Sequence, residues 1–167
     1  MTSCKICLLG ASAVGKTSLV RRFVKGIFDE RYLTTVGVKI DKRTVERDGE
    51  QINLILWDLS GEDEFSQLRM SYLRGAAGYL LVADGLRPAT LAKVIDLERR
   101  ARAELGVRPF VLALNKADRS DDWRLDEAEL QSLQDEGWTI LRTSALTGDG
   151  VEKAFDMLAG AARPSTV

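Results

Sequence analysis

A glycine-bearing segment near the N-terminus combines residue types that can hold phosphate groups. It reads Gly10-Ala11-Ser12-Ala13-Val14-Gly15-Lys16-Thr17, which matches the pattern G-x-x-x-x-G-K-[ST]. Glycines let the backbone turn tightly, so successive N–H groups point at phosphate oxygens, and the helix that starts here adds its positive dipole end. Lys16 supplies a charge for the β and γ phosphates, and Thr17 supplies a hydroxyl ligand for Mg²⁺. The segment predicts a nucleoside triphosphate site, and we include the next residue, Ser18, in it.

Two later polar segments predict that the base is guanine. Asn115-Lys116-Ala117-Asp118 follows the continuous apolar run Phe110–Leu114. A carboxylate at Asp118 can accept two hydrogen bonds from the N1 and N2 groups of guanine, whereas adenine would leave that carboxylate buried and unpaired. Four such residues alone are a weak pattern, but behind a phosphate loop and a buried strand they are a strong one. Thr143-Ser144-Ala145 follows the last expected strand, where a backbone N–H can meet guanine O6; the motif is weak alone and gains weight from its position.

Asp58 is the candidate for a second metal contact. It ends a stretch in which Ile52, Leu54 and Leu56 alternate with other residues, as in a half-buried strand. A carboxylate at the end of such a strand can hold a metal-bound water, and Mg²⁺ prefers oxygen ligands. The alternative is a solvated aspartate at a strand end, which the phosphate loop disfavours.

Short apolar runs alternate with helical patterns, which predicts an α/β fold with a six-stranded, mostly parallel sheet and about five helices. The dipeptide Asp48-Gly49 predicts a hairpin and therefore one antiparallel strand. We expect strands near residues 5–9, 38–46, 51–57, 78–83, 110–114 and 138–142. Helices are expected after the phosphate loop, within 60–74, over 89–105, from Asp126 to near Gly137, and from Val151 onward. Ligands of such sheets bind beyond the carboxyl ends of the strands, where all of these motifs lie.

The bulk composition is that of one ordinary globular domain. The chain has 167 residues, 45% hydrophobic and 29% charged, with a net charge of −1. We expect a single domain over 1–167, with its core near 3–160 and a short tail over 161–167. No overall basic field exists to attract nucleic acid, so no nucleic-acid partner is expected.

Cysteine and histidine content restricts the chemistry further. The only cysteines, Cys4 and Cys7, lie in an apolar run, where residues three apart on a strand point to opposite faces. We therefore expect two buried cysteines rather than a redox or metal pair. The absence of histidine excludes Ser-His-Asp and Cys-His mechanisms.

The expected setting is the reducing cytoplasm, as a monomer. No apolar run approaches the ~18 residues of a membrane span, and the first residues lack the layout of a signal peptide. Thr2 follows Met1, and no cysteine stands near the C-terminus, so no lipid anchor is expected in this chain.

Taken together, these motifs resemble the five nucleotide-binding motifs of Ras-superfamily small GTPases, in the same order and spacing over about residues 3–160. They are the phosphate loop, Thr35, Asp58-Leu59-Ser60-Gly61, Asn115–Asp118 and Ser144-Ala145. Trp57-Asp58 and Thr34-Thr35-Val36-Gly37 look most like the Rab branch. In contrast, residues 84–88 do not look Rab-like and favour a prokaryotic relative or a Roc-like G domain.

The resemblance implies a P-loop NTPase G domain that binds GTP or GDP with Mg²⁺. It adds Thr35 as a Mg²⁺ ligand, the Gly61 N–H as a γ-phosphate contact, and Phe28 and Tyr32 as nucleotide contacts; Lys116 would lay its stem along the base. Because hydrolysis removes the contacts of Thr35 and Gly61, two loops would change on hydrolysis. Effector, exchange-factor and activating proteins would bind through residues 25–37 and 59–75. The implied catalytic residues are Lys16, Thr35, Gly61 and Glu62.

Glu62 departs from this family's pattern, which usually has glutamine at that position. Glutamine both donates and accepts, whereas ionised glutamate only accepts and brings negative charge toward an anionic ligand. We therefore expect slow intrinsic hydrolysis. Two alternatives stay open: Glu62 acts as a general base, or it faces solvent while a partner supplies the catalytic group. Leu146 also departs from the family's usual lysine and slightly weakens the last base loop.

Three functions fit the sequence. The first is a GTP-hydrolysing molecular switch, which we favour. The second is a GTP-bound scaffold or binding module with little hydrolysis, which Glu62 favours. A third, an ATPase or small-molecule kinase, is disfavoured by the guanine-reading Asp118.

Overall fold

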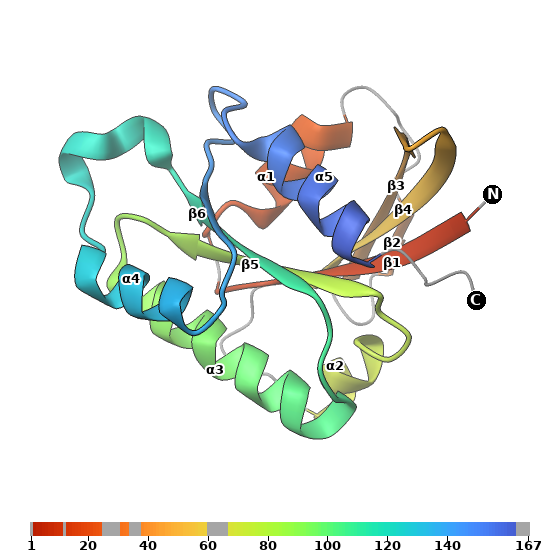
Figure 1. The fold of residues 1–167 in the computed structure, drawn as a ribbon, viewed down its shortest axis with the longest axis horizontal. Helices are drawn as coiled ribbons and strands as arrows, with labels where there is room; N and C mark the ends of the chain where they lie inside the picture. Colours follow the sequence, from red (N-terminus) through yellow and green to blue (C-terminus); the bar gives the residue numbers. More distant parts are fainter. Residues whose placement is uncertain (1, 12, 25–30, 34–37, 60–66, 163–167) are drawn as a thin grey trace.

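The fold is a seven-stranded sheet covered by helices on both faces (Figure 1). It is described by a computed structural model over residues 2–11, 13–24, 31–33, 38–59 and 67–162. The strands are β1 (Thr2–Leu9), β2 (Arg31–Leu33), β3 (Val38–Arg47), β4 (Glu50–Leu59), β5 (Gly78–Asp84), β6 (Phe110–Asn115) and β7 (Ile140–Arg142). The helices are α1 (Lys16–Val24), α2 (Gln67–Tyr72), α3 (Pro88–Leu105), α4 (Glu127–Asp135), α5 (Val151–Ala162) and the 3-10 helix η1 (Ala117–Asp122).

The strand order is β2-β3-β4-β1-β5-β6-β7, and only β3 runs against the others within the described residues. The predicted α/β fold with one antiparallel strand is therefore confirmed. The turn of the β3–β4 hairpin is made by Asp48 and Gly49, both with positive φ (54° and 79°), as a tight two-residue hairpin requires. Arg31–Leu33, which lie in none of the expected strands, form the short edge strand β2 on β3.

The last strand begins two residues later than predicted. We expected it over 138–142, but β7 covers Ile140–Arg142. The backbone N–H of Trp138 donates to the carbonyl oxygen of Leu133 in α4 (3.0 Å), so it closes the end of that helix instead of joining the sheet. The Trp138 ring packs edge-on against Phe110, with 4.8 Å between ring centroids.

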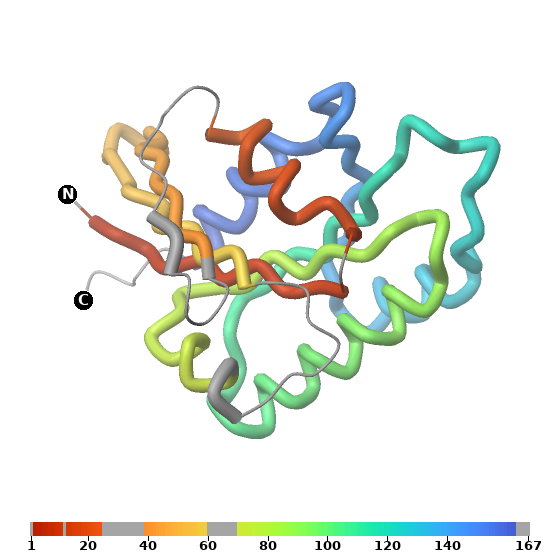
Figure 2. The backbone as a smooth tube through the Cα atoms, turned by 180° about the vertical axis from the view of Figure 1, so that it is seen from behind, coloured from red at the N-terminus to blue at the C-terminus, as the bar shows by residue number. Residues whose placement is uncertain are grey.

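Alternation along β1 divides the core into two layers. Cys4, Ile6 and Leu8 belong to the layer under α1 and α5, whereas Cys7 and Leu9 belong to the layer that includes residues of α2, α3 and α4. Figure 2 shows the same arrangement from behind, with α1 beside α5. The prediction of two buried, diverging cysteines is confirmed. Burial raises the pKa of the Cys7 thiol to about 12, which keeps it protonated and unreactive.

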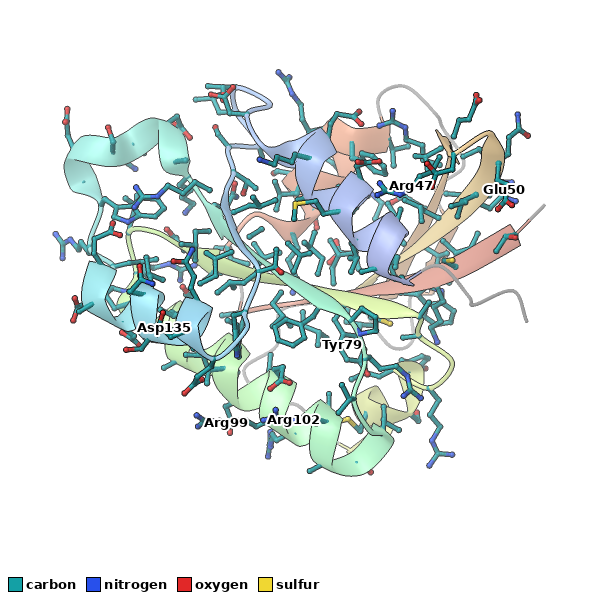
Figure 3. All side chains as sticks on the ribbon, viewed as in Figure 1. Arg47, Glu50, Tyr79, Arg99, Arg102 and Asp135 are labelled. Carbon is teal, nitrogen blue, oxygen red and sulfur yellow. The ribbon has the colours of Figure 1, made fainter. Side chains whose placement is uncertain are left out.

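Aromatic stacking and arginine pairs connect α5 to its neighbours. The rings of Phe23 and Phe155 stack with centroids 4.1 Å apart. Arg43 of β3 lies over the Phe23 ring and pairs with Glu152 of α5. Arg47, labelled in Figure 3, pairs with Asp156 of α5 at 3.0 Å. Helix α1, helix α5 and strand β3 therefore form one connected unit beside the phosphate loop.

The outer surface of α3 is charged. Arg99 and Arg102 extend from the side of α3 that faces away from the sheet (Figure 3). Arg102 lies 3.5 Å from Glu98 one turn earlier, an i, i+4 pair in which Arg102 is exposed and Glu98 is buried. Among the residues that the structure describes, no helix has the length and apolar character needed to cross a membrane.

Replacing Phe155 with alanine should remove the stacking contact between α1 and α5 and leave a cavity. We expect the free energy of unfolding, measured by urea denaturation, to fall by about 3–5 kcal/mol. Val107→Ala serves as the control, because Val107 is 79% exposed. It should change the free energy of unfolding by less than about 0.5 kcal/mol. A loss for Phe155→Ala below about 1 kcal/mol would contradict a tightly packed contact here.

Candidate functional site

The phosphate-loop segment joins the end of β1 to the start of α1. Parallel pairing with β4 and β5 holds β1 in the middle of the sheet, so the loop emerges at the edge where these strands end. Gly15 has φ +102°, a conformation that suits glycine. Lys16 is only 6% exposed and its ammonium donates to the Gly10 carbonyl oxygen at 2.9 Å. The lysine charge is therefore held inside the loop rather than in bulk solvent.

Thr17 and Asp58 meet although 41 residues separate them. Asp58 lies opposite Leu8 in the parallel β1–β4 register, which places it near the phosphate loop. The Thr17 hydroxyl donates to Asp58 Oδ2 at 2.6 Å, and Asp58 is buried. A hydroxyl and a carboxylate side by side are oxygen donors of the kind that Mg²⁺ takes, so these residues fit the predicted metal.

Asn115 connects three loops through its side-chain amide. Its Nδ2 donates to the carbonyl oxygen of Val14 in the phosphate loop at 2.8 Å. Its Oδ1 accepts from the Ala145 N–H and from the Thr143 hydroxyl, both at 3.3 Å. Asn115 is 2% exposed, so it acts as a structural tie between the phosphate loop and both base loops.

The Asp118 carboxylate is oriented by Ser144. The buried Ser144 hydroxyl donates to Asp118 Oδ1 at 2.7 Å and accepts from the Thr147 N–H at 3.1 Å. Lys116, two residues before Asp118, has the left-handed backbone angles φ 70° and ψ 33°. This conformation turns the chain sharply after β6. Asp118 itself is exposed at the edge of the sheet, where a ligand can reach it.

Asp84 is a buried charged residue of this site that the sequence motifs did not single out. It ends β5 and is 0% exposed. Asp84 Oδ2 accepts from Lys116 Nζ at 2.7 Å and from Arg87 Nε at 2.9 Å, and Oδ1 accepts from the Leu86 N–H at 2.8 Å. Burial alone would raise the pKa of Asp84, but the bonds from Lys116, Arg87 and Leu86 outweigh it and lower that pKa. The signal available in the sequence was a lone aspartate closing a wholly apolar strand at the ligand edge.

The remaining predicted positions divide between described and undescribed residues. Val14 is buried in the core, Ala13 and Ser18 are exposed, and Leu146 is 76% exposed. Several predicted nucleotide, metal or catalytic positions lie outside the described residues: Ser12, Phe28, Thr35, Gly61 and Glu62. The backbone of Tyr32 in β2 pairs with that of Lys39 in β3.

Comparison with known proteins independently supports the family resemblance seen in the sequence. A sequence model of the Ras family matches residues 5–163. The chain is similar to Ras-related protein Rab-8B of Pongo abelii, 34% identical over 93% of this chain and 76% of that protein. It is also similar to Ras-related protein RAB1BV of Beta vulgaris, 35% identical over 93% of this chain and 74% of that protein. Ras-related protein RABA2c of Arabidopsis thaliana is 35% identical over 93% of this chain and 73% of its own length.

The contact between Gly15 and Asn115 can be tested with two glycine variants. A Cβ added at Gly15 would overlap the side-chain amide of Asn115, whereas one added at Gly75 meets nothing within 4 Å. Both glycines have positive φ (102° and 78°), so each alanine variant carries about 1–2 kcal/mol of backbone strain. We expect Gly15→Ala to lower the free energy of unfolding in urea by at least about 2 kcal/mol more than Gly75→Ala does, because it also displaces Asn115. Equal losses would contradict a close-packed junction between the two loops.

Proposed function

The chain belongs to the Ras family of small GTPases, and on that premise we propose that it is a molecular switch whose own hydrolysis of GTP is slow. It would bind GTP and GDP with Mg²⁺ and convert GTP into GDP and phosphate. One observation carries this proposal: Lys16, the Thr17–Asp58 pair and the Ser144–Asp118 pair stand at one edge of the sheet, joined by Asn115.

Base selection rests on Asp118. Guanine presents N1–H and N2–H₂ as adjacent donors, and a carboxylate can accept from both. Because Ser144 already fixes one Asp118 oxygen, less side-chain entropy is lost when the base binds. Adenine would leave the carboxylate without these donors, which supports selection of guanine over adenine.

The phosphates would lie over the loop that holds Lys16. The Lys16 ammonium, held by the Gly10 carbonyl, supplies positive charge for the β and γ phosphates. Thr17 and Asp58 are the described residues that would hold Mg²⁺, directly or through water. When bound, Mg²⁺ neutralises charge on the phosphate oxygens.

The reaction is in-line attack of a water oxygen on the γ-phosphorus. A phosphorus–oxygen bond forms to water, the bond to the β–γ bridging oxygen breaks, and the water proton ends on phosphate or solvent. Lys16 would stabilise the charge that develops on the transferring group and on the leaving oxygen. Thr35, Gly61 and Glu62 are assigned to this step by resemblance alone. An ionised Glu62 cannot donate to the γ-phosphate, which supports a slow rate without a partner.

Glu62 also supports a second candidate function, a GTP-bound scaffold or binding module with little hydrolysis. In both cases we propose that residues 25–37 and 59–75 are read by effector, exchange-factor and activating proteins. We also propose a monomer that works in the cytoplasm.

Base selection can be tested by replacing Asp118 with alanine. We expect GTP affinity to fall by about 10²-fold or more, while the much weaker ATP affinity hardly changes. Inosine triphosphate, which lacks the exocyclic amino group, should bind the wild type more weakly than GTP does, and Asp118→Ala should reduce that difference. Competition against labelled GDP measures all three affinities.

Asp121→Ala is the matched control, because Asp121 is an exposed aspartate three residues away. It should keep the preference for GTP. If Asp118→Ala retains the wild-type ratio of GTP to ATP affinity, another residue reads the base.

Hydrolysis can be tested by single-turnover measurements on preloaded GTP. Glu62→Gln should accelerate phosphate release by roughly tenfold or more, because an amide can donate to the γ-phosphate while orienting water. Glu46→Gln, at an exposed position of β3, should leave the rate unchanged. Lys16→Ala should lose tight binding of GTP. If Glu62→Gln instead slows hydrolysis, Glu62 is a general base and the proposal of slow hydrolysis is wrong.

A further inference from the structure

The turn between β5 and α3, residues 84–88, contacts the loop over residues 115–118 that we assign to the base. In the parallel β5–β6 register, Asp84 lies opposite Asn115, the first residue of that loop. The Gly85 N–H donates to the Asn115 carbonyl oxygen at 3.0 Å, which extends the pairing by one step. The sheet therefore places a buried carboxylate directly beside the start of the segment that carries Asp118.

Asp84 holds Lys116 by charge. Lys116 Nζ and Arg87 Nε both donate to the same oxygen, Asp84 Oδ2, at 2.7 and 2.9 Å. Since Asp84 is 0% exposed, water screens these charges far less than it screens a surface pair. Lys116 also carries positive φ, which is unfavourable for a side chain other than glycine. Attachment of its ammonium to Asp84 stabilises that backbone conformation.

A second set of contacts fixes the far end of the same segment. The Arg124 N–H donates to the Gly85 carbonyl oxygen at 2.8 Å. The Trp123 ring packs on Gly85 so closely that a Cβ there would overlap it, and the Arg142 guanidinium lies over the Trp123 ring at 4.8 Å from a ring centroid. Residues 115–124 are thus attached at both ends to one turn, and the Lys116–Asp84 pair adds a further contact next to the first end.

We propose that Asp84 is a positioning residue for nucleotide recognition: by holding Lys116, it keeps the 115–118 loop in its base-reading conformation and thereby slows nucleotide release. This inference rests on the proposed function, since it concerns the loop assigned to guanine. Asp84 acts through Lys116 and not through the phosphates. Its loss should therefore loosen the contact with the base.

The alternative role for Asp84 is structural. Its Oδ1 accepts from the Leu86 N–H and its backbone N–H donates to the Thr90 hydroxyl at 2.8 Å, contacts that close the first turn of α3. Such a role would lower stability without any special relation to Lys116. A double-mutant cycle separates the two roles, because only a positioning role makes the effects of Asp84 and Lys116 non-additive.

The experiment measures release of GDP carrying an N-methylanthraniloyl label on the ribose, displaced by excess GDP in the presence of Mg²⁺. The full chain is compared as wild type, Asp84→Asn, Lys116→Met and the double variant. Methionine keeps an unbranched side chain but removes the charge. We expect each single variant to release GDP about tenfold faster, the effect of losing one charge-assisted hydrogen bond. The double variant should be at most about threefold faster than the faster single variant.

Two controls accompany the cycle. Arg47→Gln breaks the ion pair with Asp156 between β3 and α5 and should change the release rate by less than twofold. The second control is single-turnover hydrolysis, which should be the same in Arg47→Gln and wild type. If Asp84→Asn does not fold, Asp84→Glu replaces it: the charge is kept but displaced, so faster release with the same non-additivity toward Lys116→Met is expected.

Two results would overturn the inference while leaving the proposed function intact. One is a wild-type release rate in Asp84→Asn, and the other is single effects that multiply fully in the double variant. If wild type itself binds no labelled GDP, the proposed function fails first.

Discussion

Parallel pairing of β4, β1, β5 and β6 is the constraint on which the site depends. Parallel strands all end at the same edge, so the residues that follow each strand meet although they are far apart in sequence. Asp58 and Asp84 each lie at the end of a strand at this edge, and the phosphate loop begins directly after the last residue of β1. A shift of one residue in any of these registers would turn the side chain to the opposite face of the sheet.

Loops at such an edge need further contacts, because strand pairing fixes only where they begin. Asn115 supplies them between the phosphate loop and the Thr143–Ala145 segment, and Ser144 supplies them between the two base loops. Each of these side chains is almost fully buried, and each has a protein partner for its polar atoms. A satisfied buried network of this kind rigidifies loops that would otherwise lose more entropy on binding a ligand.

Local chemistry predicted most of the fold, since its signals lie within a few residues of each other. The Asp48-Gly49 turn, the opposed cysteines of β1 and the Asp126 cap of α4 (its carboxylate accepts from the Ala128 N–H) are all of this kind. What the sequence did not reveal depends on distant partners. The role of Asp84 depends on its hydrogen bond from Lys116, which lies 32 residues later in the chain. Asn115 was predicted as a nucleotide contact, but its internal ties need the positions of Val14 and Ala145. Strand β2 pairs with β3, a partner that the local pattern of residues 31–33 does not indicate.

Asp58 and Asp84 both lie at strand ends on the same edge of the sheet. Their hydrogen-bond partners nevertheless suit them to different roles. Asp84 is matched by two cations, so a further cation would have to displace Lys116 or Arg87 from the same oxygen. Asp58 accepts from the neutral hydroxyl of Thr17, a contact that leaves its negative charge in place. A buried carboxylate bonded to a neutral donor attracts a metal ion far more strongly than one already paired with lysine and arginine. The charge balance of the site therefore favours Asp58 over Asp84 as the carboxylate that would hold Mg²⁺, and it agrees with the role proposed for Asp84 in holding Lys116.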